Sequence, residues 1–382
     1  MKLLLILCLT LSLTLLATEK KKNTDEIDHI SLATLLLKDG HISRANEELN
    51  KVNLEDEKID KIKYFTLKGM VFTKQKEYAK ANDFFRQSIL AGQIDKAVYL
   101  YIAQNSFKLE DYKGTLQAID DAGLLIHDKP SIFALKAESY WRLEEENKAL
   151  ETLRDAIIRF EGNYSFYKQR FGYLISLKLY QSALEDANVY VKHAVPNEKT
   201  SLSFISALRK SGATDKAISL AEKVNLQFLE SAEITVLLAH LYLDKEMIQA
   251  AADLFDQASI EDGKYTKEAA EMMRRAKEFN TALYKNSQIL DTKEKLKQRI
   301  AIYIEYGAYE KIVVSRNAII RSKLIEDENI RYALAYAYYM VSDFEQCENE
   351  LKQLTKPDLF KKATELRKNM QKCKNNLWEC SI

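Results

Sequence analysis

Small residues recur in this chain at a fixed interval of 34, and no other feature restricts the fold as strongly. One series, here called the Ala81 series, consists of Ala81, Thr115, Ala149, Ala183, Ala217 and Ala251. A second, the Gly69 series, stands twelve residues earlier and is small at four of its six positions: Gly69, Ala103, Ala137, Phe171, Ile205 and Ala239. A constant interval of this length indicates a tandem array in which each repeat packs on its neighbours.

Each repeat has the pattern of two amphipathic helices, one around each series, joined by a short polar turn such as Lys74-Gln75-Lys76-Glu77. Small residues let paired helices approach closely, and large apolar residues fill the remaining space: Phe72, Tyr140 and Tyr242 in the first helices, and Phe85, Ile119, Leu153 and Phe255 in the second. The composition agrees, because ten Gly and three Pro are few for a β-rich or glycine-loop fold. The sequence therefore predicts an all-α fold.

At these residues the chain resembles the tetratricopeptide repeat (TPR) family. The unit with Phe65, Gly69, Phe72, Tyr78, Ala81, Phe85 and Ser88 matches the family pattern best. The resemblance implies a right-handed α-solenoid of tandem helix-turn-helix units. We expect a TPR array over 26–265, with units starting near residues 26, 62, 96, 130, 164, 198 and 232. A degenerate helical unit follows over 266–291, two further units over 292–357, and a capping helix with a cysteine-containing tail over 358–382.

The first residues have the pattern of an export signal. Lys2 is followed by an apolar run from Leu3 to Leu16 and by the small residue Ala17, so residues 1–17 are predicted to be a signal peptide and 18–25 a polar N-terminal segment. The run is shorter than the ~20 residues that cross a bilayer, although a retained anchor stays possible as an alternative. Cleavage near Ala17 would place the protein in the periplasm or cell envelope.

Charge and motifs argue against several classes of function. With 57 Lys+Arg against 56 Asp+Glu, the chain lacks the basic surplus of proteins that bind nucleic acid through its phosphates. The five histidines are scattered, so no metal site is predicted: His29, His41, His127, His193 and His240. Glycine-rich phosphate loops and nucleophile motifs are also missing from the sequence. We expect no catalytic residues, no cofactor and no small-molecule substrate.

The TPR resemblance implies that the first helices of successive units line a groove that binds a protein or peptide segment. We expect the partner site between about residues 96 and 215, at Leu100, Gln104, Phe107, Ala134, Glu138, Trp141, Lys168 and Arg209. The same mapping puts His240 and Leu243 at groove positions of a later unit. Phe107 and Trp141 could instead pack between helices. Any membrane contact is expected only through a partner complex.

The predicted function is that of a non-enzymatic scaffold of the bacterial cell envelope. It could act as an assembly factor for a secretion, pilus or flagellar complex, or as a structural subunit of an envelope complex. The alternative is a periplasmic holder of unfolded exported chains, and a less favoured one is an enzyme of the muramidase-associated superhelical type.

The cysteines near the C-terminus allow one disulfide with two alternative connectivities. We expect Cys373 and Cys380 to pair in the oxidising envelope, and Cys347 to stay free because it occupies the register of the Ala81 series. Pairing of Cys347 with Cys373 remains the alternative connectivity.

Overall fold

The computed structural model describes residues 27–375, which form α-helices joined by turns and three short 3-10 segments, with no strand in that range. The predicted signal peptide, the polar segment up to residue 25 and Cys380 lie outside the described residues. None of the helices in 27–375 is long and apolar enough to cross a membrane. The chain divides into two compact units, with unit 1 ending at Ala156 and unit 2 beginning at Ile157.

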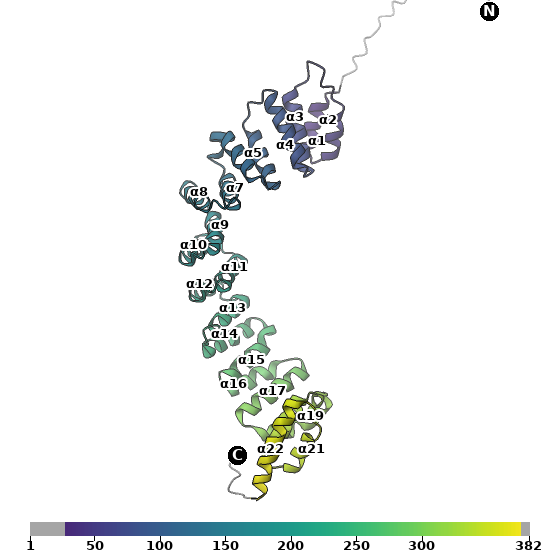
Figure 1. The fold of residues 1–382 in the computed structure, drawn as a ribbon, viewed down its shortest axis with the longest axis vertical. Coiled ribbons are helices and arrows are strands. Elements are labelled where there is room, and N and C mark those ends of the chain that lie inside the picture. The colour runs from purple at the N-terminus through teal and green to yellow at the C-terminus, as the bar shows by residue number, and fades with distance from the viewer. Residues whose placement is uncertain (1–26, 376–382) are drawn as a thin grey trace, which may run out of the picture. The chain divides into compact units, whose positions relative to one another are not determined.

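Unit 1 consists of consecutive helix pairs (Figure 1). Its helices are α1 (His29–Lys38), α2 (Ile42–Asn50), α3 (Lys61–Lys74), α4 (Tyr78–Leu90), α5 (Ala97–Lys108), α6 (Tyr112–Ala122), α7 (Pro130–Arg142) and most of α8 (Glu146–Arg159). Each odd-numbered helix is the first helix of a predicted repeat and each even-numbered one the second. The first helices begin within three residues of the predicted starts.

Unit 2 continues the same alternation. Its helices are α9 (Ser165–Ser176), α10 (Tyr180–His193), α11 (Glu198–Lys210), α12 (Thr214–Gln227), α13 (Ala232–Leu243), α14 (Ile248–Glu261), α15 (Thr266–Arg275), α16 (Phe279–Gln288), α17 (Thr292–Tyr306), α18 (Tyr309–Val314), α19 (Arg316–Arg321), α20 (Glu328–Met340), α21 (Phe344–Leu351) and α22 (Pro357–Asn375). The stretch expected to be degenerate keeps both helices, α15 and α16, each shortened to ten residues. The second helix after α17 is divided at Ser315 into α18 and α19.

The small residues of both series lie in the helix interfaces. Every member of the Ala81 series has no exposed surface. In the Gly69 series, Gly69 faces the ring of Phe85, and a methyl group added at Gly69 would lie 2.6 Å from that ring. This separation is far below van der Waals contact, so only glycine permits the approach of α3 to α4 seen here.

The turns inside the helix pairs adopt a left-handed backbone at one fixed place. Lys76, Glu110, Glu144, Lys178, Gly212 and Glu246 follow one another at intervals of 34, and all have positive φ angles near 60° to 80°. A left-handed residue ends the first helix of each pair and turns the chain into the second. Lys or Glu occupies five of these six positions, which explains how the array forms its turns with so few glycines.

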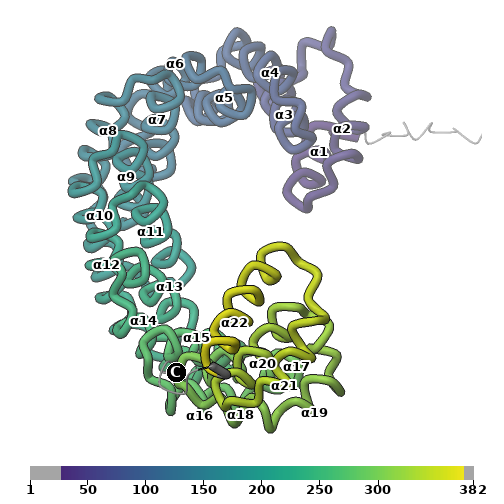
Figure 2. Tube along the Cα trace, turned by 60° about the horizontal axis from the view of Figure 1, so that its bottom comes forward, coloured from purple at the N-terminus to yellow at the C-terminus, as the bar shows by residue number. Residues whose placement is uncertain are grey.

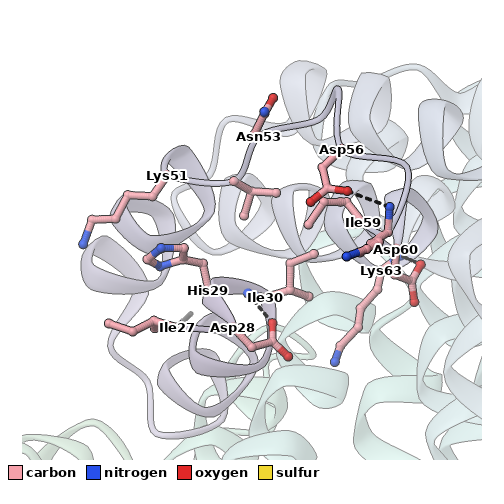
Figure 3. Close-up of a pocket in the computed structure, with 12 residues that line it drawn as sticks. Ile27, Asp28, His29, Ile30, Lys51, Asn53, Asp56, Ile59, Asp60 and Lys63 are labelled. Carbon is pink, nitrogen blue, oxygen red and sulfur yellow. Dashed lines mark hydrogen bonds between the residues drawn. The ribbon is translucent and has the colours of Figure 1, made fainter. Parts of the chain in front are cut away.

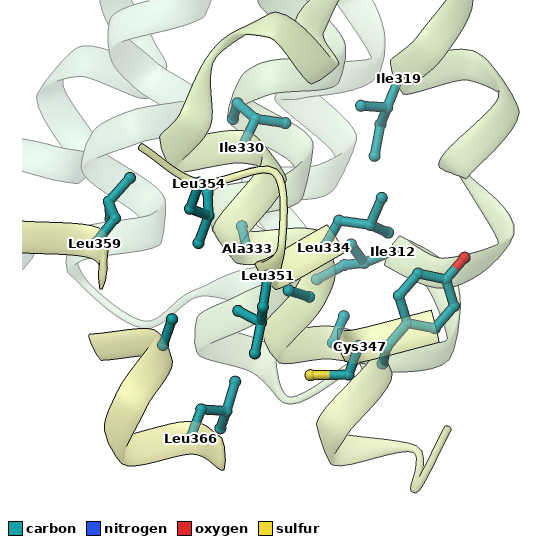
Figure 4. Packing of buried hydrophobic residues seen from close by; sticks show 14 of the residues in the cluster. Ile312, Ile319, Ile330, Ala333, Leu334, Cys347, Leu351, Leu354, Leu359 and Leu366 are labelled. Carbon is teal, nitrogen blue, oxygen red and sulfur yellow. The ribbon is translucent and has the colours of Figure 1, made fainter. Parts of the chain in front are cut away.

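Helix α22 covers the end of unit 2. Its apolar stripe consists of Leu359, Ala363, Leu366, Met370 and Cys373, all buried. These residues continue the core of α20 and α21, which includes Leu334 and Leu351 (Figure 4). Figure 2 shows α22 alongside these helices. A terminal repeat would otherwise leave one apolar face open to water, and α22 closes it.

The described cysteines differ in state. Cys347 is a buried free thiol, and burial raises its pKa to about 12. Cys373 is disulfide-bonded. The alternative pairing of Cys347 with Cys373 is therefore wrong. The physical reason is that Cys347 occupies the small-residue register of the Ala81 series, inside the core. The pairing of Cys373 with Cys380 remains a proposal, since Cys380 lies outside the described residues.

Candidate partner-binding groove

Three successive first helices of unit 2, α13, α15 and α17, border a cavity of ≈ 710 Å³. It is lined by His240, Leu243, Phe255, Lys267, Glu268, Glu271, Met272, Arg274, Arg275, Glu294, Lys297, Gln298 and Ala301. His240 and Leu243 are the positions that the family mapping assigned to the groove of this unit. All of these residues except Phe255, which is on α14, belong to first helices of three consecutive repeats, so the cavity is a groove across the array and not a gap inside one hairpin.

The sequence of α15 explains how this groove forms. Ala269, Ala270 and Met273 are buried on one side of the helix, against α14 and α16. Glu268 and Arg275 stand seven residues apart and are exposed on the groove side. Since α15 has only ten residues, its small buried face leaves most of its charged side chains at the groove.

The apolar part of the groove comes from a few residues. Phe255 and Met272 are buried at its base, while Leu243 and Ala301 are partly exposed at its walls. This apolar area is large enough to contact about one apolar side chain of a bound segment, and that contact would release water from both surfaces. The groove can take an apolar anchor flanked by polar contacts.

Ion pairs hold the two walls of α15 and α17 together. Lys267 pairs with Glu294 across the groove, and Arg274 pairs with Glu305 in the same direction. Arg274 also lies 2.5 Å from Glu271. The hydrogen bond from Lys267 lowers the pKa of the Glu294 carboxyl. The hydrogen bonds that Arg274 donates, first to Glu271 and then to Glu305, raise the pKa of the Arg274 guanidinium. These groups fix the width of the groove and are already satisfied within the chain.

Two cationic side chains remain available at the groove. Arg275 is exposed, and its Nη1 lies 3.8 Å from the Met272 sulfur. Lys297 is half-exposed, and its Nζ stands 3.9 Å from Asp327, at the outer limit of an ion pair. An acidic side chain of a bound segment could reach either cation, which would orient that segment along the groove.

His240 forms part of the wall as a neutral ring. It packs edge-on against Phe255 at a centroid distance of 5.3 Å. Burial lowers the pKa of His240, and the positive charge of Arg209 lowers it further against the opposing effect of Asp244. At neutral pH the ring is therefore uncharged and compatible with an apolar partner side chain.

The sequence-predicted site residues lie on four first helices. In unit 1, Leu100 and Gln104 of α5 line a cavity of ≈ 470 Å³ together with Tyr101 and the start of α7. Phe107 is half-buried, and its ring meets Tyr112 edge-on at 5.4 Å. Contact with the second helix of its own repeat agrees with the packing alternative for Phe107.

The other three predicted residues of unit 1 are on α7. Ala134, Glu138 and Trp141 are all half-buried. Glu138 accepts a hydrogen bond of 2.7 Å from Arg142 one turn later. Intermediate burial of Trp141 fits both an anchor and a packing role, so its assignment to the partner site stays a prediction.

In unit 2, Lys168 on α9 is exposed, and its Nζ lies 3.5 Å from the Thr200 hydroxyl. Arg209 on α11 donates two hydrogen bonds to Asp244, of 2.6 and 2.9 Å. This two-point geometry occupies the guanidinium. A partner acid would have to compete with Asp244 for Arg209, whereas Lys168 carries no such carboxylate pair among the described contacts.

A further cavity, of ≈ 480 Å³, lies between the ends of α1, α2 and α3 in unit 1 (Figure 3). Two aspartates at this cavity accept hydrogen bonds from backbone N–H groups. Asp28 accepts hydrogen bonds from the N–H groups of Ile30 and Ser31, and Asp60 from that of Lys63. Helix capping accounts for these carboxylates, and the charged residues around them carry no arrangement aimed at a ligand. Within residues 27–375, no cluster of His, Cys, Asp and Glu could hold a metal ion.

No protein-family model matches the chain, and no curated protein matches it either. Among solved structures, PilF of Pseudomonas aeruginosa is 16% identical, with a TM-score of 0.39, over 54% of this chain and 93% of that chain. The C-terminal part of a TPR repeat-containing protein from Cytophaga hutchinsonii is 14% identical, with a TM-score of 0.43, over 61% and 93%. The structure of Naa15/Naa10 bound to HypK-THB is 12% identical, with a TM-score of 0.42, over 90% of this chain and 61% of that chain. The described residues form an all-α repeat fold of paired helices, most of which follow one another at a 34-residue period.

Proposed function

We propose that this protein is a non-enzymatic scaffold that binds a segment of a partner protein in the groove of α13, α15 and α17. The observation that carries the proposal is the placement of an apolar base, made by Phe255 and Met272, beneath two available cations on consecutive first helices. Binding would bury one apolar anchor and pair one or two acidic groups.

The predicted export signal supports a task in the bacterial cell envelope, such as assembly of a secretion, pilus or flagellar complex. The alternative, a holder of unfolded exported chains, would use the same apolar base with many weakly bound partners. The two proposals differ in stoichiometry, which makes them separable by crosslinking.

A photo-crosslinking residue introduced at Ala301, in the groove wall, tests the proposal in cells of the source organism. The matched control carries it at Leu226, which is 74% exposed on the second helix α12. One partner recovered in stoichiometric amount from Ala301 and not from Leu226 supports the assembly scaffold. Many partners from Ala301 alone favour the holder, and equal recovery from both positions contradicts the groove.

Replacement of the groove residue Leu243 by Ser should raise the dissociation constant of the identified partner by about 30-fold. This ratio corresponds to the loss of an anchor that contributes about 2 kcal/mol to binding. Leu226→Ser provides the control, with unchanged affinity. Leu226→Ser should keep the wild-type thermal midpoint, whereas Leu243→Ser should lower it by a few degrees because Leu243 also packs against the core of α13 to α17. Affinities are therefore compared at a temperature at which circular dichroism shows both proteins fully folded.

The residues predicted between 96 and 215 give a second, separate proposal for the same function. If Trp141 anchors a partner, Trp141→Ala should lose partner recovery while melting normally. If it packs in the array, the same change should lower the free energy of unfolding by about 3 kcal/mol or more. A variant that melts normally and still recovers its partner removes Trp141 from the site.

A further inference from the structure

Helix α22 carries a basic face that the groove does not use. Lys361, Lys368 and Lys372 recur at helical spacing and lie directly opposite the buried stripe of Leu359, Ala363, Leu366, Met370 and Cys373. All three lysines are exposed. The cap therefore has an apolar side that closes unit 2 and a charged side turned to solvent.

The charge of this helix stands out against that of the chain. Between Pro357 and Cys373 there are five basic residues, Lys361, Lys362, Arg367, Lys368 and Lys372, against the two acids Asp358 and Glu365. The surplus of three in this part of α22 compares with a surplus of one for all 382 residues. A local positive field of this kind attracts anionic surfaces.

Contacts within the chain neutralise only part of this charge. Arg367 donates hydrogen bonds of 2.8 and 3.0 Å to Glu348, and Lys368 lies 2.9 Å from Glu365. Lys361 and Lys372 have no ion pair among the described residues, and both lower the pKa of Glu365 through their charge, after the larger effect of its hydrogen bond from Lys368. The three lysines therefore surround one carboxylate and outnumber it.

Phe360 adds an apolar element beside the lysines. It precedes Lys361 and is 56% exposed. Adjacent helical residues are about 100° apart, so the ring of Phe360 stands at the edge of the lysine row, between that row and the buried stripe. Because the stripe itself is buried, a membrane contact of α22 would rest on the lysines, with Phe360 as the one apolar side chain at the border.

We propose that the exposed face of α22 docks on a bilayer containing anionic phospholipids. The lysines favour this partner because each ammonium is a point charge without the forked geometry that recognises one particular carboxylate or phosphate, and the single Arg is occupied by Glu348. A surface with many mobile anionic headgroups satisfies such separate charges together. This inference is independent of the groove, and it differs from the expectation of membrane contact only through a partner complex, which the vesicle experiment below also tests.

Vesicle sedimentation tests the proposal with the chain from Thr18 onwards, which keeps every described residue and removes the apolar run of residues 3–16, itself able to partition into lipid. The vesicles contain phosphatidylcholine alone or with about 30% phosphatidylglycerol. Wild type should bind the anionic vesicles, bind neutral ones far more weakly, and dissociate as NaCl rises to about 0.5 M, where surface charges are screened.

The decisive variant is Lys361→Gln/Lys368→Gln/Lys372→Gln, which should lower partitioning about 100-fold, at roughly fivefold for each lysine. The control triple variant, Lys74→Gln/Lys108→Gln/Lys210→Gln, removes the same charge from exposed lysines elsewhere and should bind as wild type. Phe360→Ser should give a smaller loss. Circular dichroism should show unchanged helix content in all of them.

Three results would overturn the proposal. The first is equal loss of binding in the two triple variants, since this would reflect net charge alone. The second is equal binding of wild type to neutral and anionic vesicles. The third is displacement from anionic vesicles by soluble polyglutamate at an equal concentration of charge, which would assign the face to an acidic protein.

Discussion

Within residues 27–375, each unit buries one lysine in the interface between neighbouring helices, and the two lysines are accommodated differently. In unit 1, Lys68 is 4% exposed, and its Nζ donates to the side-chain oxygens of Asn46 and Asn50. In unit 2, Lys285 is 5% exposed, and its Nζ lies 2.8 Å from Asp256 and 3.0 Å from the Ser259 hydroxyl. One ammonium group is held by neutral dipoles, and the other by an opposite charge.

The difference shows what a buried charge requires of its neighbours. Neutral amide oxygens replace only part of the hydration of an ammonium group, so burial lowers the pKa of Lys68. At Lys285 the carboxylate of Asp256 supplies the missing compensation, but each charge then depends on the other. Lys68 can be removed without leaving an uncompensated charge, whereas Lys285 cannot.

The largest effect is expected for Lys285→Met, which should lower the free energy of unfolding by about 3 kcal/mol, because Asp256 loses its counter-charge while remaining mostly shielded from water. Urea denaturation measures the change. The double variant Lys285→Met/Asp256→Leu should recover most of the loss. No recovery in the double variant would mean that packing, not charge, explains the cost.

A second effect should follow from the buried thiol of Cys347, whose pKa is raised to about 12 from 9.0. Between these values the folded chain keeps a proton that the unfolded chain has lost, so the free energy of unfolding should fall as pH rises from about 9 towards 12. In Cys347→Ala the fall should be shallower. Identical slopes for both proteins would show that the buried tyrosines alone cause the alkaline loss.

Lys68→Met should change the free energy of unfolding by less than about 1 kcal/mol, with an increase expected, because the uncompensated ammonium is replaced by a side chain of similar length. Asn46 and Asn50 are near enough to solvent to bond to water instead. A loss comparable with that of Lys285→Met would remove the distinction between the two lysines.

The smallest effect concerns the pH dependence of that same substitution. Because the folded-state pKa of Lys68 lies below its ordinary value of 10.5, the unfolded chain binds more protons between the two values, and the stability contributed by this site rises with pH across that window. The advantage of Lys68→Met over wild type should therefore shrink as pH approaches 10.5. Parallel curves for the two proteins would contradict a lowered pKa.

The sequence was sufficient to predict the helix pairs, because the 34-residue period depends on small residues that must lie in helix interfaces. Gly69 illustrates this, since the nearby ring of Phe85 excludes any side chain. The buried lysines could not be predicted. A lysine in an amphipathic helix ordinarily faces solvent, and the burial of Lys68 depends on two asparagines contributed by the preceding repeat.

The groove was predicted only in part. His240 and Leu243 were assigned to it by their register, but no residue of α15 or α17 was. Helix α15 begins at Thr266, 34 residues after α13, whereas α17 begins at Thr292, only 26 residues after α15, so the period does not place Ala301. The cavity forms where a shortened helix pair brings three first helices into one site. Such a site depends on helix length and packing, which the period does not describe.

The left-handed turns also affect how the array responds to force. A lysine or glutamate in this backbone conformation costs roughly 1 kcal/mol relative to glycine, and Lys76, Glu110, Glu144, Lys178 and Glu246 each place that cost between two helices of one repeat. Gly40, Gly212 and Gly307 do not carry it. Opening a hairpin releases this cost where the turn residue is Lys or Glu, but not where it is Gly. Under tension, we therefore expect the hairpins with charged turns to open at lower force than those with glycine turns.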